Sequence, residues 1–390
     1  MEFNFITNPR TYFGPGKVNL LPDLVNTFGR RLLLITGQYS FRKSVQMQNL
    51  MHTFADRAIE VSIETVGPEP PPQIIDDIVG KYRQKGVDVV AGVGGGSVVD
   101  AGKAVSAMLM KRESVVSYLE GVGHLIHDGQ KVPYIAVPTT AGTGSEATKN
   151  AVLTRAGKNG FKKSLRHDRF VPDIAIVDPE LTLDCPADVT AACGMDALTQ
   201  LLEALMSTHA SPMTDVLVMG ALHELGDALV RVSTDAPRNV ELRSRISYAS
   251  YISGVALANA GLGVVHGFAS VIGGMAEVPH GVVCGTLLAE VLHHNFKSLA
   301  STQPESPVLI KAQQALVCLT GQTTEDSPVR AADALAVLLA QWTQELDIPR
   351  LSPYGVTRED LPVIASATGL KHNPVPLSTA ALTRILEARL

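Results

Sequence analysis

The sequence predicts two domains of different class: an α/β domain with a parallel, Rossmann-like sheet, followed by an all-α domain. Two observations carry this prediction. In the first half of the chain, short apolar runs alternate with segments of helical spacing, which is typical of strands joined by crossover helices. After about residue 182, strand-like runs nearly vanish and long helical patterns replace them. We therefore place the α/β domain at residues 1–181 and the helical domain at residues 182–390.

Length and charge narrow the class of protein. The 390 residues suffice for two domains with their own cores. The formal net charge of −5, with no basic cluster among aromatic residues, argues against nucleic acid as a partner. No apolar run reaches about 18 residues and the first residues lack a signal-peptide pattern, so we expect no membrane partner and a cytoplasmic location. The four cysteines lack paired short spacing, and we expect free thiols.

In the α/β half, apolar runs bounded by turn residues predict strands at 31–36, 58–63, 87–91, 133–138 and 174–177. Helices are predicted at 40–54, at 73–84 and directly after the third strand. Ligands of a parallel sheet wrapped by helices bind at the carboxyl ends of its strands. Gly37, Thr139 and Thr140 stand at such ends, as does a run of glycines after residue 91.

Helical spacing in the second half is clearest at 188–208, 212–232, 241–260 and 328–346. Trp342 falls on the apolar side of the last of these segments, and we expect it in the core. The chain shows no internal repeat and no low-complexity tract, so the two domains are not built from copies of one unit.

The glycine run, residues 92–103 with the sequence GVGGGSVVDAGK, joins a predicted strand to a predicted helix. Consecutive glycines let the backbone approach an anion, and the new helix offers unpaired N–H groups and the positive end of its dipole. This favours a phosphate site and a nucleotide ligand. The run is neither the G-x-G-x-x-G fingerprint nor a P-loop, so a tight turn that binds nothing stays open as an alternative.

A second loop, residues 138–148 with the sequence PTTAGTGSEAT, follows the next predicted strand. Its hydroxyl side chains, glycines and exposed N–H groups are suited to phosphate, although an ordinary solvated loop has a similar composition. Because the carboxyl ends of parallel strands meet at one edge of the sheet, the two loops together favour a single site.

A third constellation lies in the helical half. Asp196, Gln200 and Glu203 are spaced i, i+4, i+7 and share one face of a predicted helix within apolar surroundings. A buried carboxylate needs a partner or a metal. Together with His266 and His280, Asp196 has the donor types of a divalent-cation site. For either histidine alone, a hydrogen-bonded core residue is the alternative.

These three constellations, in this order, resemble the iron-containing (group III) alcohol dehydrogenase family. The likeness runs over nearly the whole chain, from residue 12 to residue 377. The matching pieces are GGGSVVD at 94–100, PTTAGTGSE at 138–146, DPEL at 178–181, GMDAL at 194–198, His266 and His280. The resemblance implies a dehydroquinate synthase-like architecture, with the active site in the cleft between the two domains.

The resemblance also implies NAD or NADP and usually one divalent metal, iron or zinc. The implied cofactor-binding positions are Gly95, Gly96 and Ser97 at the pyrophosphate, and Thr139, Thr140, Asn150, Lys162 and Leu181 along the cleft; Gly37 and Asp100 are further candidates. The implied metal positions are Asp196, Gln200, His266 and His280. Relatives are commonly dimers or larger, so we expect a homo-oligomer.

Two positions depart from the family pattern. Gln200 stands where relatives have a histidine ligand, and its amide oxygen is a weaker donor to iron or zinc. Ser270 stands where many relatives have a histidine near the nicotinamide; serine can relay a proton but cannot hold one at pH 7. Metal affinity and proton transfer are therefore the two properties in which this chain is expected to differ.

The preferred cofactor is a separate question. Relatives selective for NAD often carry an aspartate after an early strand, where this chain has Gly37. Without that carboxylate nothing repels a 2′-phosphate, and Arg42 or Lys43 could neutralise one. The sequence therefore leans toward NADP.

The expected function is hydride transfer between a nicotinamide cofactor and a small alcohol, aldehyde or ketone. A bound cation would polarise the substrate oxygen, with His266, His280 and Ser270 as the catalytic side chains. Without metal, an imidazolium at His266 or His280 would have to polarise the carbonyl. The alternatives are a metal-independent reductase of the maleylacetate reductase type, a lyase of the wider superfamily and a non-catalytic nucleotide-binding protein.

Overall fold

A parallel sheet forms the centre of the first domain in the computed structural model, which describes residues 2–6, 8–38, 41–155, 157 and 160–390. Within this described part the sheet has six strands in the order β1-β8-β5-β4-β2-β3. Their bounds are β1 Arg10–Phe13, β2 Arg31–Gly37, β3 Glu60–Val66, β4 Val89–Gly94, β5 Tyr134–Pro138 and β8 Ile174–Val177. Every neighbouring pair is parallel.

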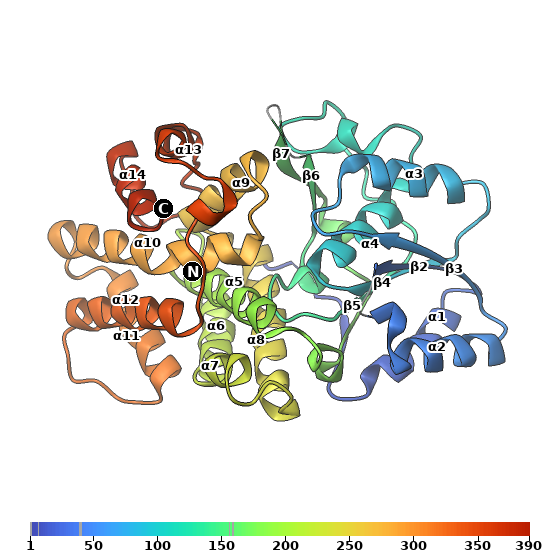
Figure 1. The fold of residues 1–390 in the computed structure, drawn as a ribbon, viewed down its shortest axis with the longest axis horizontal. Helices are drawn as coiled ribbons and strands as arrows, with labels where there is room; N and C mark the ends of the chain where they lie inside the picture. The colour runs from blue at the N-terminus through green and yellow to red at the C-terminus, as the bar shows by residue number, and fades with distance from the viewer. Residues whose placement is uncertain (1, 7, 39–40, 156, 158–159) are drawn as a thin grey trace.

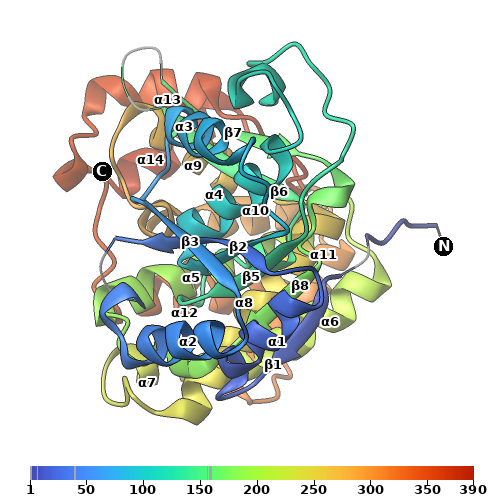
Figure 2. The same cartoon turned by 90° about the vertical axis from the view of Figure 1, so that its right-hand side faces the viewer.

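Helices cover both faces of this sheet, as Figure 2 shows. One layer contains α1 (Leu21–Asn26) and α2 (Val45–Asp56), and the other contains α3 (Pro72–Tyr82) and α4 (Gly96–Met108). Along β2, Leu32 and Leu34 pack into one core and Leu33 and Ile35 into the other. A strand that buries both faces must be apolar throughout, which explains the continuous apolar runs of the sequence.

The order of the strands fixes where a ligand binds. From β2 the chain proceeds to β3 on one side and then crosses to β4 on the other side of β2. The crevice at such a reversal, outside the carboxyl ends of the strands, is the usual ligand site of an open α/β sheet. Gly37 ends β2 and the glycine run begins at the end of β4, so both lie at this crevice.

The second domain is helical and lies beside the first (Figure 1). The long helices α5 (Ala187–Met206), α8 (Val240–Ala260) and α10 (His280–Thr302) pack together at its centre. The remaining helices are α6 Pro212–Leu225, α7 Ala228–Ser233, α9 Val264–Met275, α11 Pro307–Thr320, α12 Pro328–Glu345, α13 Leu361–Ala367 and α14 Thr379–Ala388. Among the described helices, none alone has the length and apolarity to cross a bilayer; α8 and α9 reach them only together, across a 99° bend.

The predicted fold class, an α/β domain followed by an all-α domain, is confirmed, with three differences in the elements; the division at residues 181 and 182 stays a prediction. The segment 212–232 is not one helix, because Gly226 (φ 17°, ψ −125°) interrupts it between α6 and α7. The edge strand β1 was not predicted; it is short and pairs with β8. An antiparallel hairpin, β6 (Asn150–Arg155) and β7 (Phe161–Arg166), was also missed, and Figure 1 shows it between the two domains. Trp342 is buried, as predicted.

Candidate active site

A cleft of about 490 Å³ is lined by residues of both domains. The α/β domain contributes residues of the glycine run, the second loop and the β6–β7 hairpin, and the helical domain contributes residues of α5 and α9 and the start of α10. The predicted site residues that line it are Gly96, Ser97, Asp100, Asn150, Lys162, Gln200, His266, Ser270 and His280. The structure therefore brings the predicted nucleotide loops and the predicted histidines into one space.

The first turn of α4 has the features of a phosphate site. Gly95 is the N-cap and no side chain caps the helix, so its first N–H groups remain available. A Cβ on Gly96 would lie 2.7 Å from the Thr143 hydroxyl oxygen, so the glycine run packs closely against the second loop. Thr140 lies beside Gly95. Absence of a side chain at Gly96 is thus required by the packing of one loop against the other.

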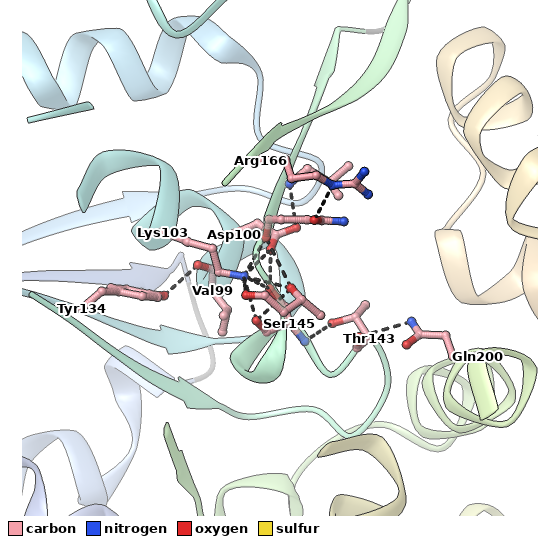
Figure 3. A network of polar contacts seen from close by, with 11 residues as sticks. Val99, Asp100, Lys103, Tyr134, Thr143, Ser145, Arg166 and Gln200 are labelled. Atoms are coloured by element: carbon pink, nitrogen blue, oxygen red, sulfur yellow. Dashed lines mark hydrogen bonds and ion pairs between the residues drawn. The ribbon is translucent and has the colours of Figure 1, made fainter. Parts of the chain in front are cut away.

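Two buried charges of α4 hold the second loop in place (Figure 3). The Nζ atom of Lys103 donates to the carbonyl oxygens of Ser145, Thr148 and Asn150 at 2.8, 2.9 and 2.6 Å. Burial lowers the pKa of Lys103 to about 8. The Asp100 carboxylate accepts the Ser145 hydroxyl and, at 3.0 Å, the backbone N–H of Val152. Asp100 therefore anchors the loop while also bordering the cleft.

Four potential metal donors meet at the helical side of the cleft. Asp196 comes from α5, His266 from α9, and His280 and Cys284 from successive turns of α10. Their donor atoms all lie within 4.8 Å of one another. The Oδ1 atom of Asp196 is 3.3 Å from His266 Nε2 and 3.7 Å from His280 Nε2. The Cys284 sulfur is 3.7 and 3.8 Å from the same two nitrogens.

Glu203 orients His266 by a hydrogen bond to the ring nitrogen Nδ1. Its carboxylate lies 2.7 Å from His266 Nδ1 and accepts the backbone N–H of Val265, also at 2.7 Å. A carboxylate on Nδ1 keeps a proton on that nitrogen, so Nε2, which faces Asp196 and Cys284, is the nitrogen that would bind a metal once its own proton is displaced. The third member of the i, i+4, i+7 pattern thus supports a donor in the neighbouring helix.

The electrostatics of the four donors suit a cation. Burial would raise the pKa of Asp196, but His280 and His266 hold it at about 2, so the carboxylate is ionised. Burial lowers the pKa of His280 to about 4, so this imidazole is neutral. Burial would also lower the pKa of His266, but Cys284, Asp196 and Glu203 raise it well above its ordinary value, and a metal would have to displace the second ring proton. Burial raises the pKa of Cys284 to about 12, and a metal would have to displace that proton.

The donor set fits a divalent metal. Asp196 Oδ1 is buried without a hydrogen-bond partner among the described residues, although an ionised carboxylate oxygen needs one. One carboxylate, two imidazoles and one thiolate are ligands that zinc and iron accept. We conclude that the residues present are suited to hold such an ion.

Comparison with known proteins identifies the family. The pattern of the iron-containing alcohol dehydrogenases matches residues 8–179, and that of the C-terminal part of the Fe-containing family matches residues 190–390.

The chain belongs to the iron-containing alcohol dehydrogenase family. It is an NAD(P)-dependent alcohol dehydrogenase.

Relatives and solved structures agree with this assignment. The chain is 31% identical over 367 residues to the 1,3-propanediol dehydrogenase of Klebsiella pneumoniae, covering 93% of this chain and 91% of the relative. It is 31% identical to the NADPH-dependent butanol dehydrogenase of Clostridium saccharobutylicum, covering 91% and 87%. The crystal structure of a 1,3-propanediol oxidoreductase superposes with a TM-score of 0.89 at 29% identity, covering 100% of both chains.

Gln200, one of the two positions expected to depart from the family pattern, lies at the cleft but has protein partners. Its amide nitrogen donates to the Thr143 carbonyl oxygen at 3.2 Å, and its amide oxygen accepts the Ser253 hydroxyl at 3.2 Å. The first bond joins the helical domain to the second loop of the α/β domain (Figure 3). The assignment of Gln200 as a metal ligand stays a prediction.

The remaining predicted residues take different places. Lys162 pairs with Glu69 at 2.7 Å across the cleft wall, and Asn150 Oδ1 accepts from Arg166 Nε at 2.9 Å. Ser270 donates to the His266 carbonyl oxygen at 2.8 Å. Five predicted cofactor positions do not line the cleft: Gly37 and Gly95 lie at strand and helix ends, Thr139 and Thr140 follow β5, and Leu181 packs against the core on one face of the sheet.

Sequence reasoning missed Cys284. It lies four residues after His280, and on a helix this spacing places both side chains on one face. The i, i+4 pattern was a usable signal, but a single cysteine in an apolar helix is more commonly an inert core residue.

Proposed function

We propose that this alcohol dehydrogenase interconverts a small alcohol and its aldehyde or ketone in the cleft, with the metal held by Asp196, His266, His280 and Cys284. The observation that carries the proposal is the convergence of these four donors at a cleft that the uncapped first turn of α4 also lines. The cofactor phosphates would bind that turn and the nicotinamide would extend toward the donors.

The side chains around the cleft have different roles in the proposed reaction. When bound, the metal would supply a Lewis acid for the substrate oxygen. Glu203 keeps His266 in the donating tautomer, and buried Asp196 supplies compensating negative charge. The Ser270 hydroxyl donates to a backbone carbonyl, so its lone pairs are free to accept a proton-carrying water. Cleft walls from both domains exclude solvent from the reacting atoms.

Cys284 is our proposed fourth ligand in place of Gln200. Both ends of the Gln200 amide already have hydrogen-bond partners, whereas the Cys284 sulfur lies among the other donors. The comparison of Cys284→Ala with Gln200→Ala tests this: we expect lower metal content in the first variant and native content in the second. The opposite result would restore Gln200 as the ligand.

The residues at and after the end of β2 support a preference for one of the two cofactors. Gly37 supplies no carboxylate there, and the exposed side chains of Arg42 and Lys43 follow it. We propose NADP(H) as the preferred cofactor, because a cation favours the 2′-phosphate and Gly37 provides no carboxylate to repel it.

The decisive experiment removes the metal. Purified protein is dialysed against a strong chelator, and NAD(P)H oxidation with an aldehyde panel is followed before dialysis, after it, and after adding back Fe²⁺ or Zn²⁺. We expect activity to disappear and return. Full activity after chelation supports the metal-independent reductase; cofactor binding with no net turnover supports the lyase or a non-catalytic protein. A homo-oligomer and a cytoplasmic location stay predictions.

A further inference from the structure

Positive charge gathers on one part of the cleft lining. Lys163 and Arg166 come from strand β7, and Lys371 comes from the segment after α13. The two elements face each other across the cleft: the charges of Arg166 and Lys163 both lower the pKa of Lys371. This occurs in a protein whose formal net charge is −5, so the cations are concentrated here against the overall balance.

Part of this charge has no local compensation. Lys162 pairs with Glu69 at 2.7 Å, and Arg166 with Glu120 at 3.1 Å. Lys163 and Lys371 have no ion-pair partner in the part of the chain that the structure describes. Two ammonium groups without an ion-pair partner border one cleft, and a cleft lined by charge of one sign has a positive potential because its low-dielectric walls focus the field.

Lys371 has a strained backbone conformation at its position beside the cleft. Its φ of 52° lies in the left-handed region, which non-glycine residues seldom adopt. The neighbours fix this conformation: the His372 N–H donates to the Leu262 carbonyl oxygen at 3.0 Å, and the Asn373 and Asn295 amides bond each other at 2.9 and 3.0 Å. A strained residue secured on its C-terminal side and bordering a cleft indicates a functional position.

Lys371 lies at the donor end of the cleft. The charges of Glu203 and Cys284 both raise its pKa, against the larger lowering effect of burial. Lys371 is an exposed residue where it borders the cleft. The geometry agrees: a Cβ on Gly263 would lie 2.8 Å from Glu203 Oε1 and 3.2 Å from Asn373 Oδ1, so the segment that carries Lys371 passes beside Glu203. The uncapped N-terminus of α4 already supplies N–H groups for the cofactor phosphates.

We propose that the substrate is a short aldehyde or alcohol that carries an acidic group, which Lys371 and Lys163 bind with help from Arg166. A carboxylate, sulfonate or phosphonate has this chemistry. The inference rests on the proposed function: the aldehyde carbon accepts hydride from NAD(P)H, its oxygen takes a proton, and the products are the hydroxy acid and NAD(P)⁺. The acidic group takes no part in the reaction and serves to orient the substrate.

The test compares two aldehydes of equal carbon length, succinic semialdehyde and butanal, at saturating cofactor. We expect a higher kcat/KM for the acidic aldehyde. In Lys371→Met and Lys163→Met, the kcat/KM for succinic semialdehyde should fall by about tenfold or more, because a charge-assisted contact is lost. The kcat/KM for butanal should stay unchanged. Lys297→Met, a change at an exposed lysine of α10 outside the cleft lining, is the matched control and should change neither.

The other outcomes are distinct. Equal losses for both aldehydes together with a raised KM for NAD(P)H would show that these lysines bind cofactor phosphate, which overturns the proposal. A preference for butanal in the native protein would also overturn it. Failure of the proposed function has a separate signature, because then neither aldehyde is reduced at all. Thermal unfolding of each variant confirms that it is folded.

Discussion

Glu203 shows how one residue can serve a site without facing it. The carboxylate bonds His266 Nδ1 and the Val265 N–H, both at 2.7 Å, so it fixes the ring and the first turn of α9 together. From sequence, its place on the Asp196 face of α5 was predictable, but its partner was not. That partner depends on how α9 packs against α5.

Glu203→Gln is the residue-scale prediction. The amide is a weaker acceptor for the His266 N–H, so the ring loses its fixed tautomer and orientation. We expect metal affinity to fall by about 10–100-fold. Competition with a chromophoric chelator of known affinity measures it.

Glu345→Gln, at the exposed end of α12, is the control for that measurement. Native metal affinity in Glu203→Gln would show that the hydrogen bond is structural only.

At the scale of elements, the turn from β4 into α4 depends on glycines for two reasons: an open approach to phosphate and close contact with the second loop. Gly96→Ala would place a Cβ 2.7 Å from the Thr143 hydroxyl oxygen, and displacing this loop costs about 1–3 kcal/mol. We expect weaker cofactor binding, measured by fluorescence titration with NADPH.

Gly80→Ala is the matched control. This glycine is exposed in α3 and a Cβ there meets nothing within 4 Å. The control should bind cofactor normally and gain about 0.5–1 kcal/mol in unfolding free energy. Unchanged cofactor affinity in Gly96→Ala would contradict the assigned phosphate site.

Buried Glu146 in the second loop predicts a pH effect on stability. Burial raises its pKa to about 7, so between about pH 4.5 and 7 the folded state holds a proton that the unfolded state has lost. This contribution to the unfolding free energy therefore falls as pH rises through that window. Glu146→Gln should remove the fall, which amounts to at most about 3 kcal/mol.

Urea unfolding at pH 5.5 and pH 7.5 tests the effect, with native protein and variant compared at each pH. The difference between them isolates Glu146 from the other carboxylates. An equal change with pH in both proteins would mean that Glu146 does not titrate in this range.

Sequence patterns located most elements because apolar runs end at glycine and proline here, and they failed where that signal is weak. The edge strand β1 has four residues, two of them exposed. In the hairpin, β7 contains Lys162, Lys163 and Arg166, which reads as a solvated segment. These cations border the cleft, so the missed strand contributes to the proposed substrate site.

For the whole molecule, the two-domain division was predictable from the change of periodicity near residue 182, whereas contacts across the cleft were not. The bond from Gln200 to Thr143, 57 positions earlier, is set by domain packing alone. Lys163 and Lys371 line the same cleft although they are far apart in sequence, so their placement in one cleft also depends on domain packing.

Cofactor binding should stabilise the whole chain. A ligand at 100 times its Kd raises the unfolding free energy by about 2.7 kcal/mol. At equal millimolar concentrations we expect NADP⁺ to raise the unfolding temperature more than NAD⁺ does. The double change Arg42→Ala, Lys43→Ala should abolish the difference. A larger shift with NAD⁺ in native protein would reverse the proposed preference.

All four proposed metal donors belong to helices of one domain, and the glycine turn belongs to the other. Hinge bending that widens the crevice would therefore separate nicotinamide from substrate oxygen while every donor keeps its neighbours. Product and spent cofactor could leave through the opened crevice without loss of the ion, and reclosure would restore the hydride-transfer distance. The ion would in this way be held within one domain, whereas hydride transfer would need both domains.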